Sequence, residues 1–201
     1  MATHVALLRG INLAGRNKVA MADLRAVVAS LGHTDVSTYI QSGNVLFTAA
    51  PAPGTGTGTG TGAPAGTGAL ADGLERAIAA RLGVTAPVVV LSRDELAQVI
   101  RDNPYPDEPD PKRVHAVLRR GTPSPELLGR IAEAGEKAAR SGSRDTVESA
   151  GLALYLHTPD GYGRSDLAQW LLRIVSSPHA GLTGTARNWA TVTKLLALCD
   201  A

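Results

Sequence analysis

The chain has 201 residues, of which 44% are hydrophobic and 19% charged, and its formal net charge is +2. These proportions are ordinary for a globular protein, and they exclude the strong positive field of a dedicated nucleic-acid-binding domain. Because only 3% of the residues are aromatic, we expect a mostly aliphatic core.

The signals for cellular location predict a cytoplasmic protein without membrane contact. The single cysteine, Cys199, cannot form an internal disulfide, which favours a reducing compartment. The first residues lack the basic and apolar regions of a signal peptide. No apolar run approaches the ~18 residues that a membrane-spanning helix needs.

The first half of the chain shows the element order of a split β-α-β unit. The apolar periodicity predicts, in chain order, a strand at 5–8, a helix over 24–31, strands at 36–40 and 45–48, a helix over 70–82 and a strand at 88–91. Between them, residues 49–68 repeat Gly-Thr pairs with three prolines. We expect this stretch to be a disordered insertion, because it cannot bury apolar surface.

The second half repeats this order. A short helix opens with a capping box at Ser92 and Glu95, and a linker rich in proline and acids follows over 102–112. Further elements are predicted as a strand at 114–118, a helix beginning at Ser124-Pro125, strands at 146–149 and 152–156, a helix capped by Ser165, a strand at 182–186 and a last helix after Asn188. The predicted fold is α+β, with two ferredoxin-like halves at 1–101 and 113–201 and an extra C-terminal helix.

Four segments resemble a known bacterial family. They are residues 7–12 with 15–19, 38–45, 161–165, and 186–189 with 191–196. Together they resemble the family called domain of unknown function 1697, over nearly the whole chain from Leu7 to Leu198. The resemblance implies kinship and a common fold, but no chemistry, because the family has no agreed activity.

The loop after the first strand is the most informative candidate site. Glycines let backbone N–H groups approach an anion closely, and neighbouring cations add charge. The candidate ligand-binding residues here are Arg9, Gly10, Asn12, Gly15, Asn17 and Lys18. Arg16 and Asn17 replace the lysine and hydroxyl of a P-loop, which argues against a true P-loop. The alternative is that glycine and asparagine only shape an irregular loop.

Three further segments add candidate ligand contacts, each with a structural alternative. They contribute Gln41, Ser42 and Asn44; Arg164 and Ser165; and Arg187, Asn188 and Lys194. The first set also suits a tight turn, the second a turn with a helix cap, and Asn188 an ordinary N-cap. The five histidines show no metal-ligand spacing, so we expect structural histidines and neither a metal nor a cofactor.

These candidates support three hypotheses. The first is binding of a phosphate-containing or other anionic ligand, such as a nucleotide or a nucleic-acid backbone, in a basic cleft lined by glycine and asparagine between the halves. Among these ligands, nucleic acid has less support than a small anion, because the predicted strands lack the paired aromatic residues that stack on bases. The second is an enzyme acting on a phosphorylated small molecule, with Asn12 or Asn188 orienting the reacting group. The third is a non-catalytic partner-binding protein. The sequence leaves the oligomeric state open.

Overall fold

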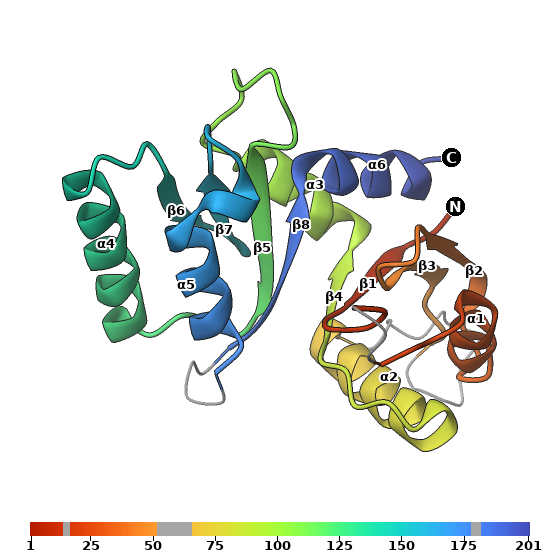
Figure 1. Ribbon diagram of the computed structural model, residues 1–201. Helices are drawn as coiled ribbons and strands as arrows, with labels where there is room; N and C mark the ends of the chain where they lie inside the picture. Colours follow the sequence, from red (N-terminus) through yellow and green to blue (C-terminus); the bar gives the residue numbers. More distant parts are fainter. Residues whose placement is uncertain (14–16, 52–65, 178–181) are drawn as a thin grey trace. The chain divides into compact units, whose positions relative to one another are not determined.

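The structure is a computed structural model that describes residues 1–13, 17–51, 66–177 and 182–201. It divides into two units, one formed by Met1–Asp94 with Leu195–Ala201 and the other by Glu95–Lys194. Each unit holds one four-stranded antiparallel sheet (Figure 1). Most of the expected Gly/Thr insertion at 49–68 lies outside the described residues.

The first unit is a ferredoxin-like half whose first strand is a fully buried inner strand of the sheet. Its elements are β1 (His4–Leu8), α1 (Met21–Ala29), β2 (Thr34–Tyr39), β3 (Asn44–Thr48), α2 (Thr67–Leu82) and β4 (Val88–Ser92). The sheet order is β2-β3-β1-β4, so β1 is hydrogen-bonded along both edges, to β3 and to β4. All five residues of β1 are buried.

The two helices of this unit pack against one face of its sheet. Leu24 of α1 and Leu74 of α2 belong to one apolar cluster with Ala6, Val45 and Phe47 of the strands. α2 ends at Gly83, whose φ of +66° gives the left-handed conformation typical of a helix C-terminus. Side chains alternate between the two faces of a strand, so Ala6, Val45 and Phe47 share the face that the helices cover.

The outer strand β2 is irregular. Its pairing with β3 shifts register between Thr34 and Ser37, as at a β-bulge. Asp35 lies inside the shift with a φ of +51°, and its carboxylate accepts a hydrogen bond from Thr48 Oγ1 at 2.7 Å.

The second unit repeats the same strand order. Its elements are α3 (Arg93–Arg101, of which the first two residues belong to the first unit), β5 (Val114–Arg120), α4 (Pro125–Arg140), β6 (Thr146–Ala150), β7 (Ala153–His157), η1 (Tyr162–Arg164), α5 (Asp166–Val175), β8 (Thr183–Asn188) and the beginning of α6 (Trp189–Cys199). The sheet order is β6-β7-β5-β8, which matches the first sheet strand for strand. The predicted α+β fold of two ferredoxin-like halves with an extra C-terminal helix is confirmed.

α4 and α5 lie side by side on one face of the second sheet (Figure 1). Ile131 of α4 and Leu171 of α5 share an apolar cluster with Val117 and Leu154 of the strands. α3 covers the opposite face, where the Tyr155 hydroxyl donates a hydrogen bond to the Val99 carbonyl at 2.7 Å. The helices are thus fixed to both faces of one sheet.

Candidate functional site

In the first unit, Asn12 ties the loop after β1 to the turn between β2 and β3. Its side-chain nitrogen donates to the carbonyls of Val19 and Gln41, at 3.0 and 3.1 Å. Its side-chain oxygen accepts from the backbone N–H of Val19 at 2.9 Å. The amide of this candidate ligand residue is therefore occupied by backbone groups of the two loops.

Two other candidate asparagines have the same role. The Asn17 side chain donates to the Gly10 carbonyl at 3.0 Å. The Asn44 side chain is fully buried and donates to the Tyr39 carbonyl at 3.1 Å and to Ser42 Oγ at 2.9 Å. These contacts favour the loop-shaping explanation for the asparagines.

The remaining candidates of this unit differ in exposure. Lys18 and Gln41 are exposed, whereas Arg9 is half-buried. Burial lowers the pKa of the Arg9 guanidinium, and the negative charge of Glu75 opposes that effect. The candidate residue Gly15 lies outside the described residues.

The turn depends on Gly43, which the sequence places in a hairpin turn at Ser42-Gly43-Asn44 but not among the candidate ligand-binding residues. Gly43 has a φ of +73°, and a Cβ atom there would lie 2.8 Å from Leu8 Cβ and 2.9 Å from Ile11 Cδ1. Its carbonyl accepts a hydrogen bond from the Leu8 N–H at 2.8 Å. A side chain at Gly43 would therefore strain the backbone and press against the end of β1.

In the second unit, the candidates Ser165 and Asn188 act as helix caps. Ser165 Oγ accepts from the Ala168 N–H at 2.9 Å, and Asn188 Oδ1 accepts from the Thr191 N–H at 2.8 Å. Each bond satisfies a backbone donor that the first turn of a helix leaves free. Capping is the structural alternative that the sequence left open for both residues.

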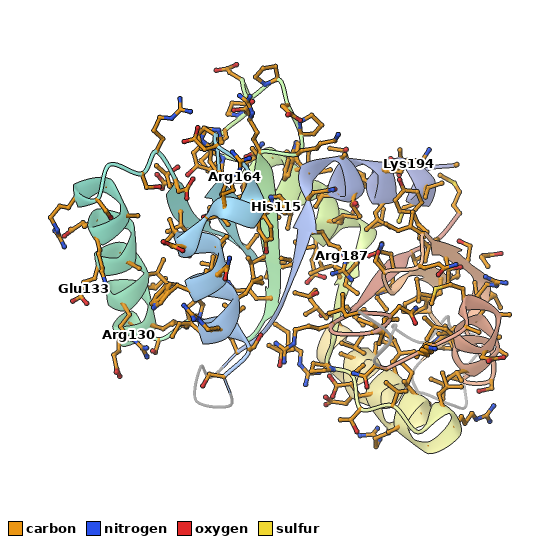
Figure 2. The ribbon with its side chains drawn as sticks, viewed as in Figure 1. His115, Arg130, Glu133, Arg164, Arg187 and Lys194 are labelled. Carbon is orange, nitrogen blue, oxygen red and sulfur yellow. The ribbon has the colours of Figure 1, made fainter. Side chains whose placement is uncertain are left out.

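The three cationic candidates of the second unit lie on different elements (Figure 2). Arg164 ends η1, and Lys194 lies on α6; both are exposed. Arg187 on β8 is half-buried, and its guanidinium donates to Thr185 Oγ1 at 2.7 Å and to the Ala186 carbonyl at 2.9 Å. Burial lowers the pKa of Arg187 to about 10.

Two histidines of the second unit have structural contacts. His157 Nε2 lies 2.6 Å from Glu108 Oε2, and the Tyr105 ring stacks on the His157 ring at 4.9 Å. The bond to His157, aided by the backbone N–H of Asp110, lowers the pKa of the Glu108 carboxyl. The pair anchors the linker at 102–112 to β7.

His115 has a strongly perturbed pKa. Its ring stacks on Tyr162 with 3.9 Å between centroids, and its Nδ1 atom is buried without a hydrogen-bond partner. Burial disfavours the charged ring and lowers its pKa from 6.5 to about 4. His115 therefore stays neutral at physiological pH.

A groove between α4 and α5 combines a cavity with unpaired charge. It has a volume of about 450 Å³. We define the α4–α5 groove by its lining residues Arg130, Glu133, Ala134, Lys137, Ala138, Ser141, Asp166, Leu167, Trp170 and Arg173. Ala134 and Ala138 are one turn apart on α4 and pack against the cluster that contains Leu167. Their short side chains leave the space that a larger residue would fill.

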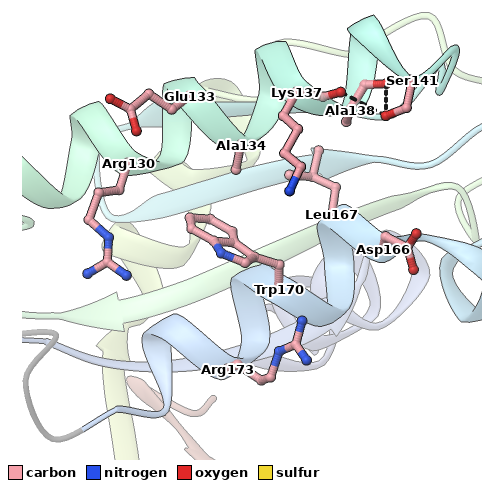
Figure 3. A pocket seen from close by; sticks show the side chains of 10 residues that line it. All are labelled: Arg130, Glu133, Ala134, Lys137, Ala138, Ser141, Asp166, Leu167, Trp170 and Arg173. Atoms are coloured by element: carbon pink, nitrogen blue, oxygen red, sulfur yellow. Dashed lines mark hydrogen bonds between the residues drawn. The ribbon is translucent and has the colours of Figure 1, made fainter.

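Three cations surround this groove. Figure 3 shows the ammonium of Lys137 and the guanidinium of Arg130 extending from α4 toward α5, where Arg173 lies beside Trp170. All three cationic side chains are exposed, and no ion pair joins any of them to another described residue. Glu133, four residues before Lys137, also lines the groove, but no ion pair joins it to Lys137.

The sequence-based candidates did not include this groove, although part of its signal was present. Arg130 and Lys137 are seven residues apart, and Trp170 and Arg173 are three apart, spacings that place each pair on one face of a helix. The missing information was that these two faces lie side by side.

Metal-ligand clusters and membrane-spanning helices are absent from the part of the chain that the structure describes. Among the described residues, no group of three or more His, Cys, Asp or Glu side chains could hold a metal ion. Within the same residues, no helix has the length and apolar character needed to cross a bilayer.

The two sheets with their flanking helices place the chain among proteins built from paired ferredoxin-like halves. A family model described as "Protein of unknown function (DUF1697)" matches residues 1–147, and the chain belongs to this family. A solved structure, that of the conserved bacterial protein SP0830 from Streptococcus pneumoniae, is similar with 22% identity over 98% of both chains and a TM-score of 0.66. At this identity the similarity shows the fold. No curated protein matches the chain.

Replacing Gly43 tests the close approach of the turn to β1. We expect Gly43→Ala to lower the free energy of unfolding by about 2–4 kcal/mol, from backbone strain and steric overlap. Urea unfolding would measure the loss. Gly10→Ala is the matched control, because Gly10 has a similar φ of +75° but open space around it. Gly10→Ala should lower the free energy of unfolding by only about 1–2 kcal/mol, because it introduces backbone strain without steric overlap. Equal losses in the two variants would contradict the steric argument.

The depressed pKa of His115 predicts a loss of stability in acid. The unfolded chain binds a proton near pH 6.5, whereas the folded chain does so only near pH 4. Stability is therefore complete above pH 6.5 and falls as the pH drops toward 4. Because the ring is partly exposed, we expect a loss of about 1–2 kcal/mol.

His115→Phe keeps a ring beside Tyr162 but cannot be protonated. Between pH 7.5 and 4.5, the variant should lose about 1–2 kcal/mol less stability than the wild type in urea unfolding. An equal loss in the two proteins would show that His115 does not contribute to the acid sensitivity.

Proposed function

We propose that the protein binds an anionic small molecule, such as one that carries a phosphate, in the α4–α5 groove. The observation that carries this proposal is the grouping of Arg130, Lys137 and Arg173 around one cavity, without ion-pair partners among the described residues. Cations held near one another repel, and a bound anion would relieve that repulsion. Guanidinium groups also match the geometry of phosphate and carboxylate oxygens.

The two acids of the lining do not cancel this charge. Glu133 is an exposed lining residue of α4, between Arg130 and Lys137 in the sequence. Asp166 lies in the first turn of α5, where the positive end of the helix dipole stabilises a carboxylate. The lining as a whole has three cations and two acids, so the groove keeps an excess of positive charge.

The groove is a better supported anion site than the glycine- and asparagine-rich loops. In those loops, the side-chain amides of Asn12, Asn17 and Asn44 donate to groups of the loops themselves. Lys18 remains an exposed cation there. A test of the function should therefore compare Lys18 with a cation of the groove.

Anion binding can be measured by calorimetry and thermal shift with inorganic pyrophosphate as the probe. We expect Lys137→Gln and Arg173→Gln each to weaken binding about tenfold, the usual effect of losing a hydrogen bond to a charged group. Added salt should weaken binding to the wild type.

Arg140→Gln is the matched control. Arg140 is on the same helix but outside the groove lining, and it pairs with Glu136 at 3.4 Å. The affinity of this variant should equal that of the wild type. If Lys18→Gln abolished binding and Lys137→Gln had no effect, the site would belong to the loop after β1. The absence of binding by the wild type would contradict the function itself.

A further inference from the structure

The aromatic residue in the α4–α5 groove narrows the class of ligand. Resting on the proposed function, we infer that the bound anion carries a planar aromatic ring that stacks on Trp170, as a nucleoside monophosphate does. The inference depends on the exposure of Trp170, on the positions of the cations around it and on the small residues opposite.

Trp170 is only half-buried, although the neighbouring Leu167 and Leu171 are almost completely buried. One part of its side chain packs against the apolar clusters beneath α4 and α5. The other part lines the groove, where Figure 3 shows the indole between the two helices. The indole is thus fixed from below and accessible from the groove, as a stacking surface must be.

The cations lie on both sides of this surface along the helix axes. Arg130 and Lys137 are seven residues apart, which corresponds to ~10 Å along α4. Arg173 follows Trp170 by three residues and lies next to it on the surface of α5. Figure 3 shows the Trp170 indole between Arg130 and Lys137, so an aromatic ring stacked on it would have a cation in each direction along the groove. A ring with an attached phosphate could use both features at once.

The opposite wall leaves room for a flat group. Ala134 and Ala138 present only methyl groups to the groove from α4. The groove volume of about 450 Å³ lies within the range typical of small-molecule sites. The Ser141 hydroxyl donates to the carbonyls of Lys137 and Ala138. The ring is therefore recognised by stacking rather than by a set of directed hydrogen bonds.

Tryptophan fluorescence provides a direct measurement, because the chain has two tryptophans. In a Trp189→Phe protein, Trp170 is the only reporter. We expect adenosine monophosphate to quench its emission and to bind at least tenfold more tightly than either adenosine or inorganic phosphate, since a stacked base adds a favourable contact of this size. Trp189→Phe itself should bind the nucleotide like the wild type in calorimetry.

Substitutions of Trp170 separate stacking from charge. Calorimetry should show that Trp170→Leu binds adenosine monophosphate about tenfold more weakly and inorganic phosphate unchanged. Trp170→Phe, which keeps an aromatic face and most of the core packing, should recover most of the nucleotide affinity. A thermal melt of each variant would confirm that it is folded.

The outcomes distinguish this inference from the proposed function. If phosphate binds and adenosine monophosphate binds no more tightly, the aromatic ligand is wrong and the anion site stands. The aromatic ligand is also wrong if Trp170→Leu weakens the binding of phosphate and of adenosine monophosphate equally, or if the nucleotide binds without quenching the fluorescence of Trp170. If no anion binds the wild type, the proposed function fails, and the inference fails with it.

Discussion

The first strand of each sheet is an inner strand that is hydrogen-bonded along both edges, and this pairing determines where the helices can lie. β1 pairs with β3 and β4, and β5 pairs with β7 and β8. The order β-α-β-β-α-β then brings both connecting helices to one face of the sheet. In the second unit these helices are α4 and α5. The α4–α5 groove is therefore a consequence of strand pairing rather than of a loop motif.

Local sequence signals predicted the elements well because the interactions behind them span few residues. The hydroxyl of Ser124 accepts from the N–H three residues later and so begins α4, as its pattern with Pro125 indicates. Ser165 and Asn188 act in the same way. By contrast, the bond from Asn12 to Gln41 joins residues 29 apart in the chain. Local patterns cannot show that those two loops meet.

The same chemistry explains why the loops attracted attention as binding sites. Glycine and asparagine expose backbone groups to ligands, but they are also the residues that most readily adopt positive φ angles. Gly43 and Asn12 have φ angles of +73° and +54°. The groove has no such signature, because its cations and Trp170 are ordinary helix residues. Its character comes from the short alanines between them, which matter only once the two helices are neighbours.

The register shift in β2 has a consequence for the behaviour of the protein at high concentration. A regular outer strand presents an unbroken row of backbone donors and acceptors, on which a strand of another molecule can assemble. In β2 the displaced pairing around Asp35 interrupts the regular spacing of that row, and the Asp35 carboxylate is bound by Thr48 of β3. An incoming strand would lose hydrogen bonds at this point. The irregularity thus makes this border of the sheet a poorer template for fibril-like self-association.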